Sequence, residues 1–261
     1  MRRVALIGNG LSIAACDGFR IPALTAAMRA ALEALDGGAL VGRLDEVGAI
    51  MANGSTDFHP ADDFEDLLGP FDRVAALLRG PLGQIVGPGP HQNVLQGASL
   101  AVATIYIRGV GAVLDVVDDQ PVQNEPVQKV VDWILDGIGP DDTVAVYALN
   151  YDPLLDRWLL EAHNDPARPH VHLDDEFTPF GHAVIQLTPG EDLELFPLRA
   201  PHLERPNNVH LYHLHGGMHW VEFADAIWKA RTIDDLRAHN VFARWAAGQH
   251  LPIALSRPTS S

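Results

Sequence analysis

Residues 143–155 constrain the fold of this chain more than any other stretch. An uninterrupted apolar run at 144–149 predicts a strand that is buried on both faces of a sheet. The run stops at a polar corner, residues 150–152. A helix is expected next, because Asp152 suits an N-cap and Pro153 suits the first helical position. In an open α/β sheet, such a corner at the carboxyl end of a strand is where ligands bind.

The N-terminus repeats this arrangement. A short apolar strand at 4–7 precedes the run Gly8-Asn9-Gly10-Leu11-Ser12, and Ser12 is expected to cap the following helix. Glycine lets the backbone approach a ligand closely, and the amides at a helix start can bind phosphate. The dinucleotide-binding motif G-x-G-x-x-G is not complete, because residue 13 is Ile. The run therefore predicts contact with a phosphate or ribose, and a plain tight turn is the alternative.

A third strand is expected at 209–215, and it ends in His215-Gly216-Gly217. If the three strands are parallel, their carboxyl ends place all three polar corners at one edge of the sheet, around a shared pocket. His215 stands at the strand end, where an imidazole can act as a base near neutral pH.

The other histidines of this strand are expected to have different roles. His210 and His213 are predicted to be buried, neutral and hydrogen-bonded. As an alternative, His213 and His215 share one face of the strand and could both bind a metal ion. No H-E-x-x-H or cysteine pattern supports that alternative, so we predict no metal site.

The segment between the first two strands is predicted to be helical. Helices are expected at 22–35, from residue 63, at 92–117 and at 126–138, with a Gly/Pro-rich loop at 80–90. This pattern predicts one domain over residues 1–261, with a largely helical insertion at 20–140.

The C-terminal half is predicted to be less regular. A helix at 153–163 is followed by a proline-rich region at 164–208, with one short strand at 184–187 and the remainder a possible flap over the site. A helical stretch at 223–245, broken near 231–232, and a final strand at 251–255 complete the expected fold.

Composition excludes some classes of function. The 261 residues carry 34 acidic and 18 basic side chains, a net charge of −16, which argues against nonspecific binding to nucleic acid or anionic membrane. The single cysteine, Cys16, excludes an intrachain disulfide and any multi-cysteine zinc site. We expect no signal peptide and no membrane span, and a cytoplasmic location.

The three corners together resemble a known superfamily. Gly8-Asn9-Gly10-Leu11-Ser12, Leu149-Asn150-Tyr151-Asp152 and Leu214-His215-Gly216 occur in this order. The set resembles the sirtuin-like domains of bacterial anti-phage defence systems such as Thoeris, as does the helix start Asp63-Phe64-Glu65. The likeness covers residues 4 to about 220.

The resemblance implies a Rossmann-like parallel sheet that binds NAD, with an inserted α-helical module. Asn150 and His215 would be catalytic, His215 acting at the ribose hydroxyls. The expected NAD-binding residues are Gly8, Asn9, Gly10, Leu11, Ser12, Tyr151, Asp152 and Gly216. In the defence branch, the reaction is hydrolysis of NAD to nicotinamide and ADP-ribose.

Three departures from the family pattern bear on this expectation. The corner has Ala148 where the family has Thr, the four zinc cysteines of deacylating sirtuins are absent, and the chain ends early, at Ser261. The missing cysteines argue against a protein deacylase.

The sequence therefore predicts an NAD hydrolase that serves as a bacterial defence effector, as a homo-oligomer or with a defence-system partner protein. One alternative is a module that binds NAD or ADP-ribose without turnover, which Ala148 and the early end favour. A metal-dependent hydrolase using His213 and His215 is the third hypothesis.

Overall fold

The computed structural model describes two compact units. The described residues are 2–51, 59–86, 89–150, 152–175, 177, 183–188, 191–198, 208–214, 217–223, 226–230 and 232–249. The sheet unit contains the described residues up to Phe19 and those from Pro121 to His239. The helical unit contains residues from Arg20 to Gln120 and the segment that begins at Asn240. The predicted final strand at 251–255 lies outside the described residues.

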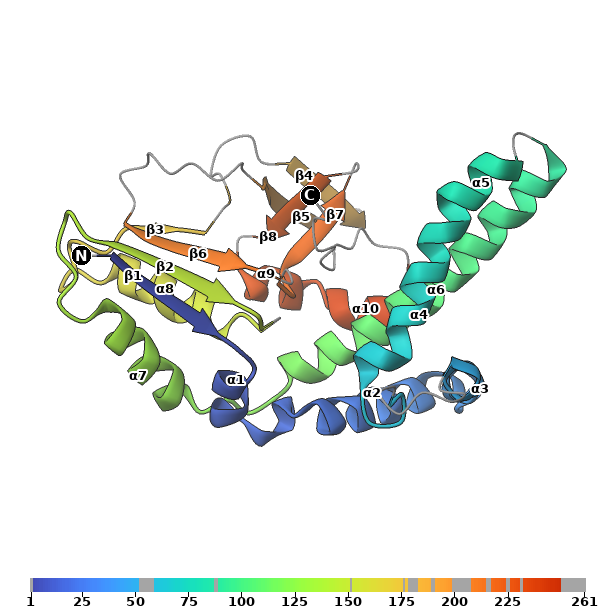
Figure 1. Ribbon diagram of the computed structural model, residues 1–261, viewed down its shortest axis with the longest axis horizontal. Coiled ribbons are helices and arrows are strands. Elements are labelled where there is room, and N and C mark those ends of the chain that lie inside the picture. Colours follow the sequence, from blue (N-terminus) through green and yellow to red (C-terminus); the bar gives the residue numbers. More distant parts are fainter. Residues whose placement is uncertain are drawn as a thin grey trace. The chain divides into compact units, whose positions relative to one another are not determined.

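A four-stranded parallel sheet forms the centre of the sheet unit (Figure 1). Its order is β1-β2-β6-β3, and its strands are β1 (Arg2–Ile7), β2 (Thr143–Ala148), β6 (Val209–His213) and β3 (Leu173–Asp174). The three strands predicted at 4–7, 144–149 and 209–215 are thus confirmed as parallel neighbours, with Ile7 paired to Ala148 and Ala148 to His213. An α/β protein with a parallel sheet is therefore confirmed.

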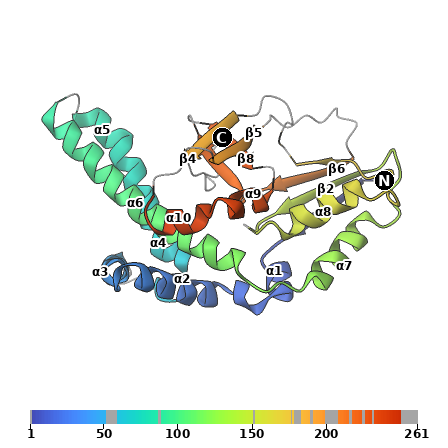
Figure 2. The ribbon, with the colours of Figure 1, turned by 180° about the vertical axis from the view of Figure 1, so that it is seen from behind.

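Two helices bury one face of this sheet. They are α7 (Asn124–Leu135) and α8 (Leu154–Asn164), and α8 lies against the sheet in the view from behind (Figure 2). Their apolar faces pack on alternate residues of the strands. The shared core includes Val131, Ile134, Leu135, Val144, Val146, Leu155, Leu159, Val209 and Leu211.

The opposite face of the sheet is less covered than the apolar run at 144–149 predicts. Val4 and Leu6 of β1 are mostly exposed, and Tyr147 of β2 is half-buried. Tyr147 stacks on Tyr212 of the neighbouring strand, with ring centroids 5.1 Å apart. The prediction that β2 is buried on both faces is therefore wrong for this face. Here the stacked rings of Tyr147 and Tyr212 are half-buried, and no aliphatic layer of described residues covers them.

A second sheet in the same unit is antiparallel. Its order is β4-β5-β8-β7, with β4 (Ala183–Thr188), β5 (Glu191–Pro197), β8 (Ala226–Ala230) and β7 (Trp220–Phe223). The strand predicted at 184–187 is confirmed. The helix predicted from 223 is wrong up to residue 230, because the β-formers Ile227 and Trp228 pair with β7.

The break predicted near 231–232 is the true start of a helix, α9 (Ile233–Ala238). Thr232 caps it: the hydroxyl accepts from the Asp235 amide, and the Asp235 carboxylate accepts from the Thr232 amide. This reciprocal capping box fixes the helix start.

The helical unit contains α2 (Ile21–Asp36), α3 (Ala39–Met51), α4 (Phe64–Arg79), α5 (Pro81–Val86), α6 (Pro90–Asp118) and α10 (Val241–Ala246). Asp63 caps α4 by accepting from the amides of Glu65 and Asp66, as the sequence predicts for this helix start. The predicted insertion at 20–140 thus begins where the helical unit begins, whereas α7 belongs to the sheet unit.

The helix α6 is long and apolar enough to cross a membrane, which the sequence analysis did not expect. Its C-terminal half is a core element of the helical unit, where Val110, Ala112, Val113 and Leu114 are buried. Its N-terminal part, residues 90–108, is mostly half-buried or exposed.

Close packing of α6 against α10 makes a glycine necessary at 111. A Cβ placed on Gly111 would lie 2.5 Å from the Ala246 amide nitrogen and 2.6 Å from the Trp245 Cβ. Gly111→Ala should therefore lower the free energy of unfolding, by about 1–3 kcal/mol, because backbone must move to admit the methyl group. Gly97→Ala is the matched control on the same helix, because nothing lies within 4 Å of its Cβ position.

Urea unfolding measures both changes. Gly97→Ala should be neutral or stabilising by up to about 1 kcal/mol, since alanine is the better helix former. Equal effects of the two substitutions would contradict the packing of α6 on α10.

Candidate functional site

Two of the three predicted corners lie side by side at the carboxyl edge of the parallel sheet. β1 and β2 are paired in register up to Ile7 and Ala148, so the chain leaves both strands at the same level. The Leu149 amide donates to the Ile7 carbonyl at 2.9 Å and extends this pairing by one residue. The glycine corner and the Asn150 corner therefore emerge together, as parallel pairing requires.

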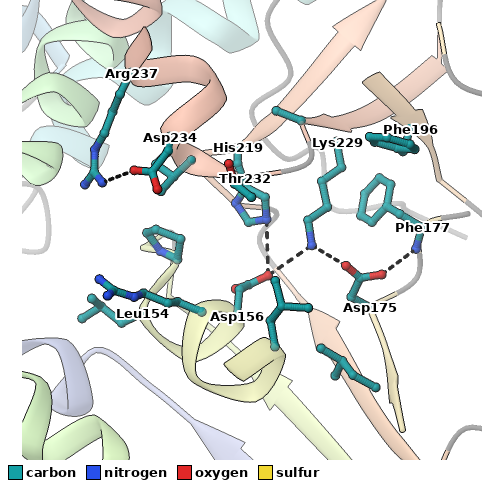
Figure 3. Close-up of a pocket in the computed structure, with 16 residues that line it drawn as sticks. Leu154, Asp156, Asp175, Phe177, Phe196, His219, Lys229, Thr232, Asp234 and Arg237 are labelled. Atoms are coloured by element: carbon teal, nitrogen blue, oxygen red, sulfur yellow. Dashed lines mark hydrogen bonds and ion pairs between the residues drawn. The ribbon is translucent and has the colours of Figure 1, made fainter. Parts of the chain in front are cut away.

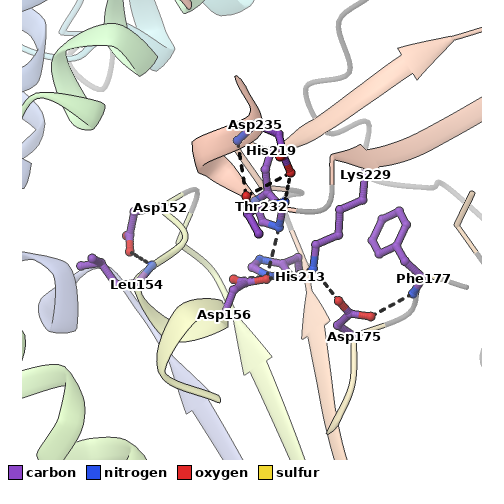
Figure 4. A network of polar contacts seen from close by, with 10 residues as sticks. All are labelled: Asp152, Leu154, Asp156, Asp175, Phe177, His213, His219, Lys229, Thr232 and Asp235. Carbon is purple, nitrogen blue, oxygen red and sulfur yellow. Dashed lines mark hydrogen bonds and ion pairs between the residues drawn. The ribbon is translucent and has the colours of Figure 1, made fainter. Parts of the chain in front are cut away.

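Three polar side chains from these corners form a directed hydrogen-bond chain. The Asn150 Nδ2 donates to the Ser12 Oγ at 2.6 Å, and the Ser12 hydroxyl donates to the Asp152 Oδ2 at 2.5 Å. The other Asp152 oxygen, Oδ1, accepts from the Leu154 amide at 3.1 Å (Figure 4). All three side chains are buried. In these hydrogen bonds Asn150 is the donor, Asp152 is the acceptor, and Ser12 accepts from the first and donates to the second. The orientations of the Asn150 and Ser12 side chains are therefore fixed before any ligand binds.

Ser12 is not the helix cap that the sequence predicts. The helix α1 (Gly10–Ala15) starts three residues earlier, with Asn9 at the N-cap position, and Ser12 lies inside it. Its hydroxyl is directed to Asp152 instead, a contact across 140 positions of sequence. Capping preference is a local property and could not reveal this partner.

The start of α8 is also shifted from the prediction by one residue. Pro153 occupies the N-cap position and Leu154 is the first helical residue. Asp152 nevertheless accepts from the Leu154 amide, so its carboxylate binds the helix start as expected.

Two features of the glycine corner leave space for a ligand. A Cβ on Gly10 would meet nothing within 4 Å, and one on Gly8 would only touch Leu149 at 3.9 Å. The Asn9 side chain is directed to another segment, because its Nδ2 donates a hydrogen bond to the Phe19 carbonyl at 3.3 Å. The backbone of Gly8 and Gly10 is therefore not crowded by other parts of the corner.

The Asn150 side chain keeps one unused acceptor. Its Oδ1 is buried and has no hydrogen-bond partner among the residues that the structure describes. A buried amide oxygen without a partner is costly. A ligand N–H or O–H group at this position would remove that cost.

The pKa of Asp152 is raised, chiefly because burial disfavours its charged form; the bonds from Ser12 and Leu154 oppose the shift, and the nearby Asp156 adds to it. When the pKa of an acid is higher in the folded state than in the unfolded state, its protonation stabilises the folded protein. This contribution to the free energy of unfolding is fully present below the unfolded pKa, about 3.9, and is lost as pH rises through the folded-state pKa.

The pH dependence of unfolding tests the environment of Asp152. Relative to Asp152→Asn, which has no proton to lose, the wild type should lose stability as pH rises from about 4 through the raised pKa. Urea unfolding at several pH values measures the difference. A wild-type protein that gains stability relative to the variant over this range would contradict the effect of burial on the Asp152 carboxyl group.

The third corner is only partly described. Strand β6 ends at His213, which pairs with Ala148, and the Leu214 amide donates to the Ala148 carbonyl at 2.9 Å. The chain thus leaves β6 next to the Asn150 corner. The predicted site residues Tyr151, His215 and Gly216 lie outside the described residues.

A second polar cluster, which the sequence analysis missed, is centred on Asp156 of α8 (Figure 4). Its Oδ2 lies 2.9 Å from the His213 Nε2, and its Oδ1 lies 3.3 Å from the His219 Nε2. The Lys229 Nζ lies 3.4 Å from Asp156 Oδ1 and 2.6 Å from Asp175 Oδ2. Asp156, His213, His219 and Lys229 have nearly inaccessible side chains. The cluster joins α8 to the antiparallel sheet through Lys229 of β8.

The charged groups of this cluster shift one another's pKa values. Burial would raise the pKa of Asp156, but His213, His219 and Lys229 together hold it well below its usual value. Burial lowers the pKa of His219, and it would lower that of Lys229, whose pKa is instead raised by Asp156 and Asp175. The carboxylate of Asp156 and the ammonium of Lys229 thus favour each other's charged form, whereas burial favours the neutral form of His219.

The geometry does not favour the metal-dependent alternative. Within the described ranges, no group of three or more His, Cys, Asp or Glu side chains is arranged to hold a metal ion. His213, one half of the predicted metal pair, is directed at Asp156, and the ammonium of Lys229 lies beside the same carboxylate. A cation so close would repel a metal ion.

A cavity of about 470 Å³ opens above this cluster (Figure 3). Apolar atoms make up most of its lining, and its polar lining residues are Asp156, Arg157, Asp175, His219, Lys229, Thr232, Asp234 and Arg237. The apolar lining comprises Pro153, Leu154, Leu160, Leu173, Phe177, Phe196, Ala230 and Ile233. Ser12, Asn150 and Asp152 do not line it, and the shared segment is the start of α8. The Asn150 corner and this cavity are therefore neighbouring features, not one site.

The sequence matches no protein-family model and no curated protein.

Proposed function

We propose that this protein hydrolyses NAD to nicotinamide and ADP-ribose. The observation that carries the proposal is the chain of bonds from Asn150 through Ser12 to Asp152, at the carboxyl ends of two adjacent parallel strands. The resemblance to sirtuin-like defence domains assigns these three residues to the NAD site. That location is the general ligand site of open parallel sheets.

Each residue has a specific part in the proposal. The free Asn150 Oδ1 would accept a hydrogen bond from the carboxamide of nicotinamide. Ser12 and Asp152 would hold the Asn150 amide in that orientation, and Tyr151 and Gly216 would border the nicotinamide ribose. The backbone of Gly8, Asn9, Gly10 and Leu11 would contact the phosphates, where the open space at Gly10 permits close approach.

The chemistry suits such a site. Water forms a bond to C1′ of the nicotinamide ribose as the glycosidic C–N bond breaks. The electron pair of the C–N bond leaves with nicotinamide. The leaving group is already cationic, so no strong acid is needed, and the ribose passes through an oxocarbenium-like state. Orientation of the nicotinamide and a positioned water supply the acceleration. His215 would take the proton from water or a ribose hydroxyl and release it to solvent.

The setting that we propose is a bacterial defence effector in the cytoplasm, held inactive by assembly or by a partner protein until infection. A toxic hydrolase of a central cofactor requires such control.

A chromatographic NAD-depletion assay tests the function. Purified protein, at increasing concentration and with bacteriophage-infected cell extract as the activating condition, should release nicotinamide and ADP-ribose in equal amounts. NAD that stays intact under every condition would contradict the proposal.

A module that binds NAD without turnover is the second candidate, and Ala148 favours it. Its side chain is buried in the sheet core, at the position where the family has a hydroxyl. Calorimetry that detects NAD binding, with no nicotinamide released in the depletion assay, would select this function over hydrolysis.

A further inference from the structure

The helical unit contains a helical hairpin whose larger apolar side chains are exposed. We define the distal hairpin as residues 73–104, which comprise the second half of α4, α5 and the first half of α6. In both overall views these three elements extend away from α2 and α3 (Figures 1 and 2). Only Ala75 and Ser99 are buried among its described side chains. The Ser99 hydroxyl donates to the Ala75 carbonyl at 3.1 Å and joins the two helices through small residues.

The larger side chains of the distal hairpin lie on its surface. Seven aliphatic residues have exposed fractions between 42% and 79%. They are Val74, Leu77, Leu82, Ile85, Val86, Val94 and Leu100. Single exposed apolar residues are ordinary on protein surfaces, but seven of them on one hairpin indicate an interaction site. A two-helix hairpin has no third layer, so its outer apolar face needs a partner.

Charge sets the distal hairpin apart from the rest of the chain. The chain has 34 acidic residues, yet none lies between Asp72 and Asp115. The charged side chains in that interval are Arg73, Arg79 and Arg108. Two copies of a protein with net charge −16 repel one another over most of their surface. Interface cores are depleted of charged residues, as this hairpin is.

We propose that the distal hairpin is a self-association surface, and that its occupant is the distal hairpin of a second copy of this chain. The two hairpins pack through their aliphatic residues into a four-helix arrangement about a two-fold axis. Because both copies bring the same acid-free surface, the contact buries apolar area without opposing two acidic patches.

The polar residues of the distal hairpin favour a protein partner over a lipid one. Gln84, Asn93 and Gln96 are exposed beside the aliphatic residues. Neutral amides can hydrogen-bond across a helix interface, whereas transfer into hydrocarbon would cost several kcal/mol for each. Residues 73–104 also contain no lysine and no Trp, Phe or Tyr, and their cationic side chains are only Arg73 and Arg79, few for a helix that lies on an anionic membrane surface.

Sedimentation of the full-length protein tests the proposal with a matched pair of variants. Ile85→Glu places a carboxylate in the distal hairpin, and Ile50→Glu makes the same change on α3; the two isoleucines are 79% and 73% exposed. The wild type and Ile50→Glu should form dimers over a hundredfold range of concentration. Ile85→Glu should raise the dissociation constant at least about tenfold, because it buries an unpaired charge in the contact.

Val94→Glu on α6 is a second variant with the same expected effect, and circular dichroism checks that each variant is folded. A wild-type protein that is monomeric throughout would overturn the proposal, as would dimers of unchanged affinity in folded Ile85→Glu and Val94→Glu. Co-sedimentation of monomeric wild type with phosphatidylserine–phosphatidylcholine vesicles, lost in Ile85→Glu, would assign the surface to lipid and also overturn it. The result is independent of NAD hydrolysis, which the depletion assay measures separately.

Discussion

Asn150→Ala should lower the rate of NAD hydrolysis at least about 100-fold. The side chain is buried, its Nδ2 donates to the Ser12 Oγ at 2.6 Å, and its Oδ1 has no hydrogen-bond partner in the described part of the chain. Alanine removes the group that we expect to orient the nicotinamide, and small losses of orientation at a reacting centre cost about two orders of magnitude. Release of nicotinamide under activating conditions, measured by chromatography, gives the rate.

The matched control is Asn164→Ala, at an exposed asparagine of α8 whose Nδ2 donates to the Leu160 carbonyl at 2.9 Å. This variant should keep wild-type activity. Asn150→Ala also leaves the Ser12 oxygen without a donor, so we expect a loss of about 1–3 kcal/mol in unfolding free energy, which urea unfolding measures. Full activity in a folded Asn150→Ala protein would remove Asn150 from the reaction.

Asp156→Ala should have the largest effect on stability, about 3–5 kcal/mol. The substitution leaves the buried ammonium of Lys229 with Asp175 as its remaining anionic partner, and it leaves His213 and His219 without the carboxylate that they share. Removing one partner of a buried ion pair exposes the full cost of the charge that remains. Asp234→Ala is the control: this carboxylate is paired with Arg237 at the surface and should contribute less than about 1 kcal/mol.

The pH dependence of this effect has a definite sign. The pKa of Asp156 is held well below its usual value, so the stability that it contributes is present above the unfolded pKa of about 3.9. That contribution is lost as pH falls toward the folded pKa. The difference in unfolding free energy between wild type and Asp156→Asn should therefore shrink below about pH 4. A difference that grows in acid would contradict an ionised Asp156 in the folded protein.

The elements that sequence could predict are those with a strong one-dimensional pattern. The apolar runs of β1, β2 and β6 and the apolar periodicity of α2, α6 and α8 each depend on near neighbours in the chain. The adjacency of the glycine and Asn150 corners followed from the rule that parallel strands end at one edge.

The features that could not be predicted depend on distant partners. The strands at 220–230 have mixed polar and apolar residues, and only their pairing with each other and with β5 makes them strands. The sequence predicts a helix at Lys229, and this prediction gives no indication of the ion pair with Asp156, 73 positions earlier in the chain. His213 was expected to be buried and hydrogen-bonded, and it is buried, but its carboxylate partner on α8 has no signal in the sequence.

A crystal structure with a non-hydrolysable carba-analogue of NAD tests the central claim most directly. The nicotinamide amide should lie within hydrogen-bonding distance of the Asn150 Oδ1, with His215 beside the ribose and the pyrophosphate along residues 8–10. A dinucleotide bound elsewhere, such as in the cavity above Asp156, or a His215 remote from the nicotinamide ribose, would contradict the site.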